Sequence, residues 1–197
     1  EYKTELERQW NAFLSAKYRT TEALRTAWRE LPEGQSLEAR NLALPARNAP
    51  VAVLNDFLVF LAERDAEYLR RMRTVVHEVT DRWVPVTGTQ VGFGGNLLHL
   101  DSHAAMDYLD NHFYVDHYNF PDVRWDARDW RIRDSSSVGS GLTAFLNVAA
   151  AREFGRPYTV SEFNQPWPNR QAAEIVPTLA AFAAFQDWDG IMHFAYA

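Results

Sequence analysis

Four short apolar or β-branched runs alternate with helical patterns in the second part of the chain, and this alternation is the strongest constraint on the fold. The runs are Val84–Thr89, Tyr108–Tyr114, Tyr158–Phe163 and Ile191–Tyr196. Helical patterns precede and follow the third run, at about Leu142 to Phe154 and about Ala172 to Phe185. Strands that alternate with helices form right-handed βαβ units with a parallel sheet. We therefore predict an α/β protein.

The first part of the chain is predicted to be helical. Apolar residues recur at three-to-four spacing in residues 3–30, and a long amphipathic pattern returns from Val51 to about Val79. Residues 35–50, with Pro45 and Pro50, read as a loop between them. With 197 residues, of which 47% are hydrophobic, and with no apparent linker, the chain is predicted to be a single domain, 1–197.

The number of predicted strands points to half of a (β/α)₈ barrel. A complete eight-stranded barrel usually takes about 250 residues. This chain offers four strand patterns and stops directly after the last of them. The expected architecture is about four parallel strands with flanking helices, corresponding to the C-terminal half of a TIM barrel.

Composition and charge exclude several classes of protein. The net charge is -6 and the basic residues are scattered, which argues against a nucleic-acid partner because phosphate binding needs clustered Lys and Arg. There is no cysteine, so disulfides and thiolate chemistry are excluded. No apolar run approaches a membrane span, so we expect no membrane partner. Cytoplasmic and secreted locations both stay open.

The first residues resemble neither a signal peptide nor a natural start. They read Glu1, Tyr2, Lys3, Thr4 and Glu5, without an initiator Met. We therefore expect that the chain begins inside a longer sequence.

Glu162 ends the predicted strand Tyr158–Phe163, where the chain passes into a loop. In barrels and open α/β sheets, the loops at the carboxyl ends of parallel strands converge on one face and carry the chemistry. A carboxylate in that place, among aromatic and amide side chains, favours a catalytic role over a surface ion pair.

Several motifs, in order along nearly the whole chain, resemble the retaining glycoside hydrolases built on the (β/α)₈ barrel, the clan of cellulases, mannanases and β-galactosidases. The first is a helix with a Trp-x-x-Phe-Leu-x-x-Lys-Tyr pattern and a downstream Ala-Leu and Ala-Trp. The matching residues are Trp10, Phe13, Leu14, Lys17, Tyr18, Ala23, Leu24, Ala27 and Trp28.

The later strands carry the other motifs of the resemblance. The run from Pro85 to Gln90 resembles the fifth strand with its substrate-facing loop, and His112-Phe113-Tyr114 resembles the His-x-Tyr of the sixth. Ser161-Glu162-Phe163 is similar to the nucleophile motif of the seventh strand, and Gly190–Tyr196 would be the eighth. The first four strands and the Asn-Glu acid/base of the clan have no counterpart in this sequence.

The resemblance implies a retaining hydrolase with Glu162 as its nucleophile, supported by Tyr114 and His112. Such enzymes need two carboxyl groups about 5–5.5 Å apart, and the second, the acid/base, is expected to lie before Glu1. Gln90, Asn164 and Trp167 are expected to contact the sugar, and so are Asp116 and His117. A metal site formed by His112 and His117 with Asp116 is disfavoured. The glycine-rich run 92–95 is expected to pass close to the ligand. No metal and no cofactor is expected.

Two other functions are kept as alternatives. An ester hydrolase would combine a serine from the Ser135–Ser137 or Gly139–Gly141 stretch with an aspartate such as Asp116 and one of the histidines His99, His103, His112 and His117. A non-catalytic remnant would bind glycans or assemble with another chain.

A half barrel would leave an apolar concave face and two open sheet edges, both liabilities for a monomer. We therefore expect a homodimer, or pairing with the missing N-terminal half of the barrel. A small molecule or an oligosaccharide is the expected substrate.

Overall fold

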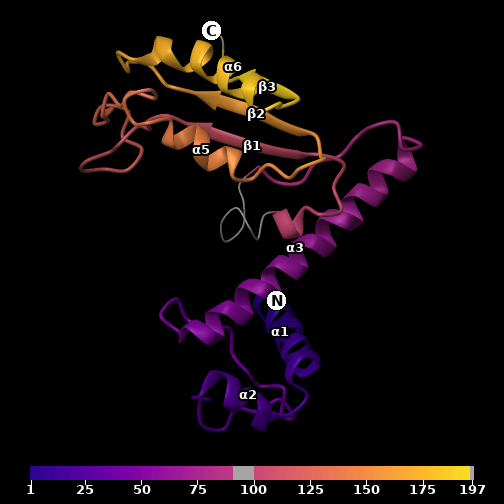
Figure 1. The fold of residues 1–197 in the computed structure, drawn as a ribbon. Helices are drawn as coiled ribbons and strands as arrows, with labels where there is room; N and C mark the ends of the chain where they lie inside the picture. Colours follow the sequence, from indigo (N-terminus) through magenta and orange to yellow (C-terminus); the bar gives the residue numbers. More distant parts are fainter. Residues whose placement is uncertain (91–99, 196–197) are drawn as a thin grey trace. The chain divides into compact units, whose positions relative to one another are not determined.

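The computed structural model describes residues 1–90 and 100–195 (Figure 1). The chain divides into two compact units, unit 1 from Glu1 to Asp65 and unit 2 from Ala66 to Ala197, and each is described by itself. The single domain expected over residues 1–197 stays a prediction.

Unit 1 is formed by helices around an aromatic core. It contains α1 (Tyr2–Tyr18), α2 (Thr21–Trp28) and the first part of α3 (Val51–Val79), which confirms the helices predicted from periodicity and the loop between them. The Thr20 side chain caps α2 by accepting a hydrogen bond from the Ala23 amide at 3.2 Å. The buried core consists of Trp10, Leu14, Leu24, Trp28, Leu37, Leu42 and Phe60.

Unit 2 contains a parallel sheet with helices, which confirms the α/β class. The strands are β1 (Leu109–Tyr114), β2 (Tyr158–Asn164) and β3 (Gly190–His193), in the order β1-β2-β3. Between them lie α5 (Thr143–Ala149), the 3₁₀ turn η1 (Ala172–Glu174) and α6 (Ile175–Phe185). Figure 1 shows the three strands side by side, and within the described residues the sheet does not close into a barrel.

The strand expected at Val84–Thr89 is not formed, which corrects the prediction of four strands. Pro85 lacks a donor, and the Val86 amide donates to the Asp107 carboxylate at 2.8 Å instead of to a strand carbonyl. One main-chain hydrogen bond, from the Asp107 amide to the Val86 carbonyl, joins this segment to the residues before β1. The segment is therefore extended beside the start of β1 without a ladder. Of the last expected run, Tyr196 lies outside the described residues.

The two faces of the sheet differ in character. One face packs against α5 and α6 in a core that includes Phe113, Val160, Phe163, Phe145 and Leu179. The other face of β1 carries Asp110, His112 and Tyr114, at every second position along the strand. The apolar concave face expected from the sequence is thus wrong for β1, because alternation places polar side chains opposite the helices. The expected homodimer stays a prediction.

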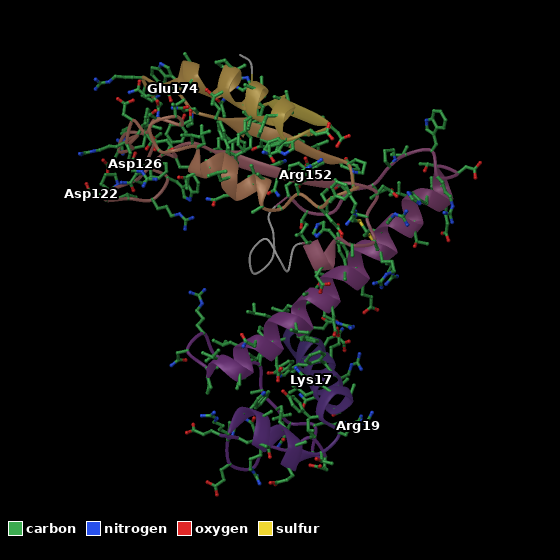
Figure 2. The ribbon with its side chains drawn as sticks, in the orientation of Figure 1. Lys17, Arg19, Asp122, Asp126, Arg152 and Glu174 are labelled. Carbon is green, nitrogen blue, oxygen red and sulfur yellow. The ribbon has the colours of Figure 1, made fainter. Side chains whose placement is uncertain are left out.

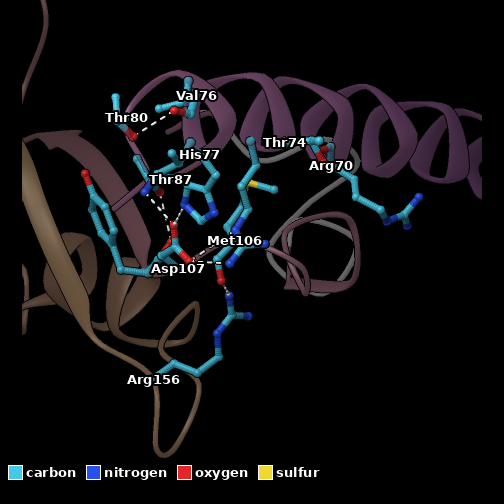
Figure 3. A network of polar contacts seen from close by, with 12 residues as sticks. Arg70, Thr74, Val76, His77, Thr80, Thr87, Met106, Asp107 and Arg156 are labelled. Carbon is cyan, nitrogen blue, oxygen red and sulfur yellow. Dashed lines mark hydrogen bonds and ion pairs between the residues drawn. The ribbon is translucent and has the colours of Figure 1, made fainter. Parts of the chain in front are cut away.

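A carboxylate just before β1 anchors the second part of α3 to the sheet within unit 2 (Figure 3). Asp107 accepts hydrogen bonds from Arg73 at 2.6 Å and from the Val86 amide at 2.8 Å, and lies 2.9 Å from His77 Nε2. Burial opposes ionisation, but the hydrogen bonds from Arg73, Val86 and His77 outweigh it and lower the pKa of Asp107 from 3.8 to about 2.

We expect Asp107→Asn to destabilise unit 2 by about 2 kcal/mol at neutral pH, because charge-assisted hydrogen bonds are lost. The folded pKa lies below the unfolded value, so this stability is complete above pH 3.8 and disappears as the pH falls toward about 2. Urea denaturation of both proteins along a pH series measures the gap between them. Asp187→Asn, at a fully exposed carboxylate, is the matched control and should show no such gap. A gap that does not change with pH would contradict the assignment.

Candidate functional site

A row of polar side chains crosses β1 and β2 on the face of the sheet opposite α5 and α6. From β1 it includes Asp110, His112 and Tyr114, and from β2 it includes Ser161 and Glu162. Glu162 lies near the carboxyl end of β2, the central strand, and is paired in register with His112. The carboxyl ends of parallel strands are where α/β proteins place their chemistry.

A β-bulge in β2 brings two successive residues to this polar face. The ladder pairs Asn111 with Val160 and His112 with Glu162, so Ser161 is an extra residue in β2, and the ladder with β3 shifts at the same place. Val160 before the bulge and Phe163 after it are both buried in the core. Regular alternation would point Ser161 and Glu162 to opposite faces, whereas the bulge lets both reach His112.

Both carboxylate oxygens of Glu162 have a partner. The Tyr114 hydroxyl donates a short hydrogen bond to Oε1, and His112 Nδ1 lies 3.4 Å from Oε2. The Glu162 side chain is 27% exposed, so a ligand has access to it from solvent. The two partners hold the carboxylate in one orientation while a ligand can reach it from solvent, as an attacking nucleophile or an anionic binding site requires.

Tyr114 is a stable donor to this carboxylate. Burial, and then the hydrogen bond and the charge of Glu162, raise the pKa of Tyr114 to about 12. The hydroxyl therefore keeps its proton far above neutral pH. The Tyr114 ring also contacts the exposed His117, with ring centroids 5.0 Å apart.

Behind His112, a chain of hydrogen bonds leads into the sheet. His112 Nε2 lies 2.9 Å from Ser161 Oγ, and that hydroxyl donates in turn to Asp110. Asp110 is 2% exposed and also accepts the Ser161 amide at 2.9 Å and the Thr159 hydroxyl at 2.6 Å. The side chains thus form one continuous series of contacts, from Asp110 through Ser161 and His112 to Glu162.

Asp116 is a loop anchor at the same end of the sheet. It accepts hydrogen bonds from the amides of His117 and Ser135, at 2.9 and 3.1 Å, and from the Asn169 side chain at 3.2 Å. Burial opposes ionisation, but these donors and the Arg133 amide prevail and lower the pKa of Asp116. The structure therefore places this carboxylate among main-chain donors, and not in contact with Glu162.

The remaining predicted sugar contacts lie around the carboxyl ends of the strands. The Asn164 side chain bridges the Gln165 amide and the Phe194 carbonyl, at 2.7 and 2.8 Å. Trp167 is 76% exposed, and its carbonyl accepts the Tyr118 hydroxyl at 3.1 Å. Gln90 is half-buried at the edge of the described residues. The glycine run 92–95 and His99 lie outside the described residues, so the structure gives no account of them.

The serines proposed for an ester hydrolase have other partners. The hydroxyls of Ser136 and Ser137 both donate to Glu174, at 2.8 and 3.1 Å. Figure 2 shows Glu174 at the same end of unit 2 as Asp122 and Asp126 of the loop that follows β1. These hydroxyls therefore stabilise the loop between β1 and α5. Among the described residues, the serines that contact a candidate histidine are Ser161, beside His112, and Ser102, 2.9 Å from His103 Nδ1.

Asp110 and Ser161 were missed as site residues in the sequence. The signal for Asp110 was present, because it precedes His112 and Tyr114 at spacing two in a predicted strand. Ser161 carried no such signal. A regular strand would have turned it away from Glu162, and a bulge cannot be read from the alternation of the residues around it.

Two structural absences hold for residues 1–90 and 100–195. No helix there is long and apolar enough to cross a membrane. No group of three His, Asp or Glu side chains in that part of the chain is placed to hold a metal ion.

Comparison with known proteins gives one match in fold. No protein-family profile matches the chain, and no curated protein sequence matches it. The chain is similar to the crystal structure of an agarase, AgWH50C, with a TM-score of 0.63 and 12% sequence identity. The similarity covers 96% of this chain and 26% of that chain, so the protein spans about a quarter of the agarase's length. The chain therefore shares its fold with part of this agarase.

Proposed function

We propose that the chain is the nucleophile-bearing half of a (β/α)₈-barrel retaining glycoside hydrolase, with Glu162 as its nucleophile. The observation that carries this proposal is the setting of Glu162. It lies at the carboxyl end of the central strand, with the Tyr114 hydroxyl on one oxygen and His112 Nδ1 3.4 Å from the other. The Tyr114 donor on one oxygen and the His112 contact on the other hold the carboxylate in one orientation, which in-line attack on an anomeric carbon requires.

The proposed substrate is a neutral oligosaccharide. The similarity in fold to an agarase makes agarose-derived galactosides the first substrates to test. The exposed Trp167 follows the nucleophile strand and offers an indole face for a sugar ring, with Asn164 and Gln90 as hydrogen-bonding partners around it. The reaction needs no metal and no cofactor.

The reaction takes place in two displacements. Glu162 forms an ester bond with the anomeric carbon while the glycosidic C–O bond breaks, and a carboxylic acid protonates the departing oxygen. Water then attacks the same carbon, gives its proton to that second carboxylate, and releases Glu162. We place the second carboxyl group on the strands that complete the barrel, supplied by a further segment or by a second copy of the chain.

Covalent trapping tests the nucleophile without the second carboxyl group. A dinitrophenyl 2-deoxy-2-fluoroglycoside has a leaving group that departs without protonation, and the fluorine slows hydrolysis of the ester. The full chain should gain the mass of one fluorosugar from the galactoside, glucoside or mannoside of this type, and peptide mapping should place it on Glu162.

Two variants sharpen this experiment. Glu162→Gln should take up no label, whereas Glu174→Gln, at the carboxylate held by Ser136 and Ser137, should label like the parent protein. Label on another residue, or none with the whole panel, would count against the proposal.

A further inference from the structure

We propose that Asp110 and Ser161 are positioning residues that fix one proton on His112 and thereby direct its second nitrogen to Glu162. The catalytic consequence rests on the proposed function, whereas the state of the His112 ring does not. The four side chains form one series of contacts on the polar face of β1 and β2.

The first step is the direction of the Ser161 hydroxyl. Asp110 is buried and accepts hydrogen bonds from the Thr159 hydroxyl, the Ser161 amide and the Ser161 hydroxyl. All three hydrogen bonds are donated to the carboxylate oxygens, which act as acceptors. The hydroxyl proton of Ser161 is therefore directed to Asp110, and the oxygen presents its lone pairs to its other neighbour.

The second step is the proton on His112. Its Nε2 lies 2.9 Å from Ser161 Oγ, which acts as acceptor, so Nε2 must carry a hydrogen. The Asp110 carboxylate, 3.9 Å from the same nitrogen, favours a proton there as well. The neutral ring is thus fixed as the Nε2–H tautomer, and any second proton has to bind at Nδ1.

The third step connects this nitrogen to the nucleophile. Nδ1 lies 3.4 Å from Glu162 Oε2, so a proton bound there donates to the carboxylate as a charge-assisted hydrogen bond. This bond is strongest when Glu162 carries its full negative charge, before it attacks the sugar and again as it leaves. His112 then stabilises the departing carboxylate in the second displacement, and Tyr114 does the same on the other oxygen.

One substitution separates this role from support of the bulge. Ser161→Ala removes the hydroxyl but keeps the main-chain hydrogen bond from residue 161 to Asp110. The bulge should therefore persist while the link to His112 is broken. Ser161→Thr retains a hydroxyl and is the conservative rescue. Ser140→Ala, which removes an exposed loop hydroxyl bonded to the Ser137 carbonyl, is the control.

Long-range ¹H–¹⁵N correlation spectra of the histidine rings in the full chain give the decisive readout. His112→Gln assigns the signals, and the alkaline part of a pH titration shows the ring with one proton. We expect the Nε2–H tautomer in the parent protein, in Ser161→Thr and in Ser140→Ala, and averaged tautomers in Ser161→Ala. An Nδ1–H tautomer in the parent protein, which needs no variant to fold, would overturn the proposal. So would an unchanged ring in Ser161→Ala.

The rate of labelling by the fluoroglycoside is the second readout. Labelling measures the first displacement, in which the fixed His112 ring holds Glu162 in the orientation for attack. Loss of a hydrogen-bond partner that orients a functional histidine costs about 10-fold or more in activity, so Ser161→Ala should label about 10-fold more slowly and Ser161→Thr should recover. If the spectra are as expected but no protein labels, the proposed function fails, and the positioning of His112 by Asp110 and Ser161 stands. If Glu162 labels but Ser161→Ala changes neither the His112 tautomer nor the rate of labelling, the positioning role fails and the proposed function stands.

Discussion

Replacing Asp56 with alanine is expected to destabilise unit 1 by about 3 kcal/mol, the largest stability effect that we expect from a single substitution. Asp56 is 4% exposed and accepts from Lys17 at 2.5 Å, from the Tyr18 hydroxyl at 2.6 Å and from Trp28 Nε1 at 2.7 Å. It therefore ties α1 and α2 to α3, and Figure 2 labels Lys17 among the side chains of unit 1. Alanine leaves the half-buried Tyr18 hydroxyl and the buried Trp28 Nε1 without an acceptor, and the lost solvation of these two donors is the main cost.

Hydrogen exchange localises this effect to unit 1. A loss of about 3 kcal/mol corresponds to roughly 100-fold faster exchange of the protected amides in α1 and α2, because 1.4 kcal/mol is about a factor of ten. The amides of β1 and β2 serve as an internal reference. Glu63→Ala, at an exposed position of the same helix, should change exchange only slightly. Unaltered protection of α1 in Asp56→Ala would show that these hydrogen bonds contribute little.

The helices of unit 1 could be predicted because the signal is local. Apolar residues at three-to-four spacing mark α1 and α3, and Pro45 and Pro50 mark the loop before α3. The cluster around Asp56 could not be predicted in the same way. It joins residues 28 to 39 positions apart, and nothing in the sequence ties an aspartate in an amphipathic helix to Lys17 or Trp28. Contacts of this range depend on how helices pack, which periodicity does not determine.

The sheet shows the same limit. Short runs with β-branched and aromatic residues predicted β1, β2 and β3 to within a few residues, because such runs are typical of strands. The run Val84–Thr89 has the same composition and yet forms no ladder. Its Val86 amide has a stronger acceptor in the Asp107 carboxylate, and Pro85 has no amide hydrogen to offer. A pattern of residue types does not show that a distant side chain will accept a hydrogen bond from a backbone amide in place of a neighbouring strand.

Part of the candidate site could be predicted from the sequence. Position at the end of a strand was sufficient to select Glu162, and spacing two placed His112 and Tyr114 on one face of β1. The bulge at Ser161 decides the rest, because it turns Ser161 and Glu162 to the same face and closes the series from Asp110 to the carboxylate. The catalytic and sugar-binding roles of these residues stay predictions that the experiments here address.

Glu162→Ala is expected to lower the turnover of a dinitrophenyl glycoside by about 10³-fold or more, because no other group replaces a covalent nucleophile. The variant also leaves a space where the carboxylate was, beside Tyr114 and His112. A small anion such as azide can occupy that space and attack the anomeric carbon directly. We therefore expect azide to restore turnover in the variant and to have little effect on the parent protein.

The stereochemistry of the rescued product separates a nucleophile from a carboxylate that only orients the sugar. The proposed mechanism has two displacements and retains the anomeric configuration, whereas attack by azide is a single displacement that yields a glycosyl azide of inverted configuration. Proton NMR of the product distinguishes the two anomers. Glu174→Ala, which removes the carboxylate bound by Ser136 and Ser137, should need no azide. If Glu162→Ala kept its rate, or if azide gave the retained anomer, the nucleophile would have to be another residue.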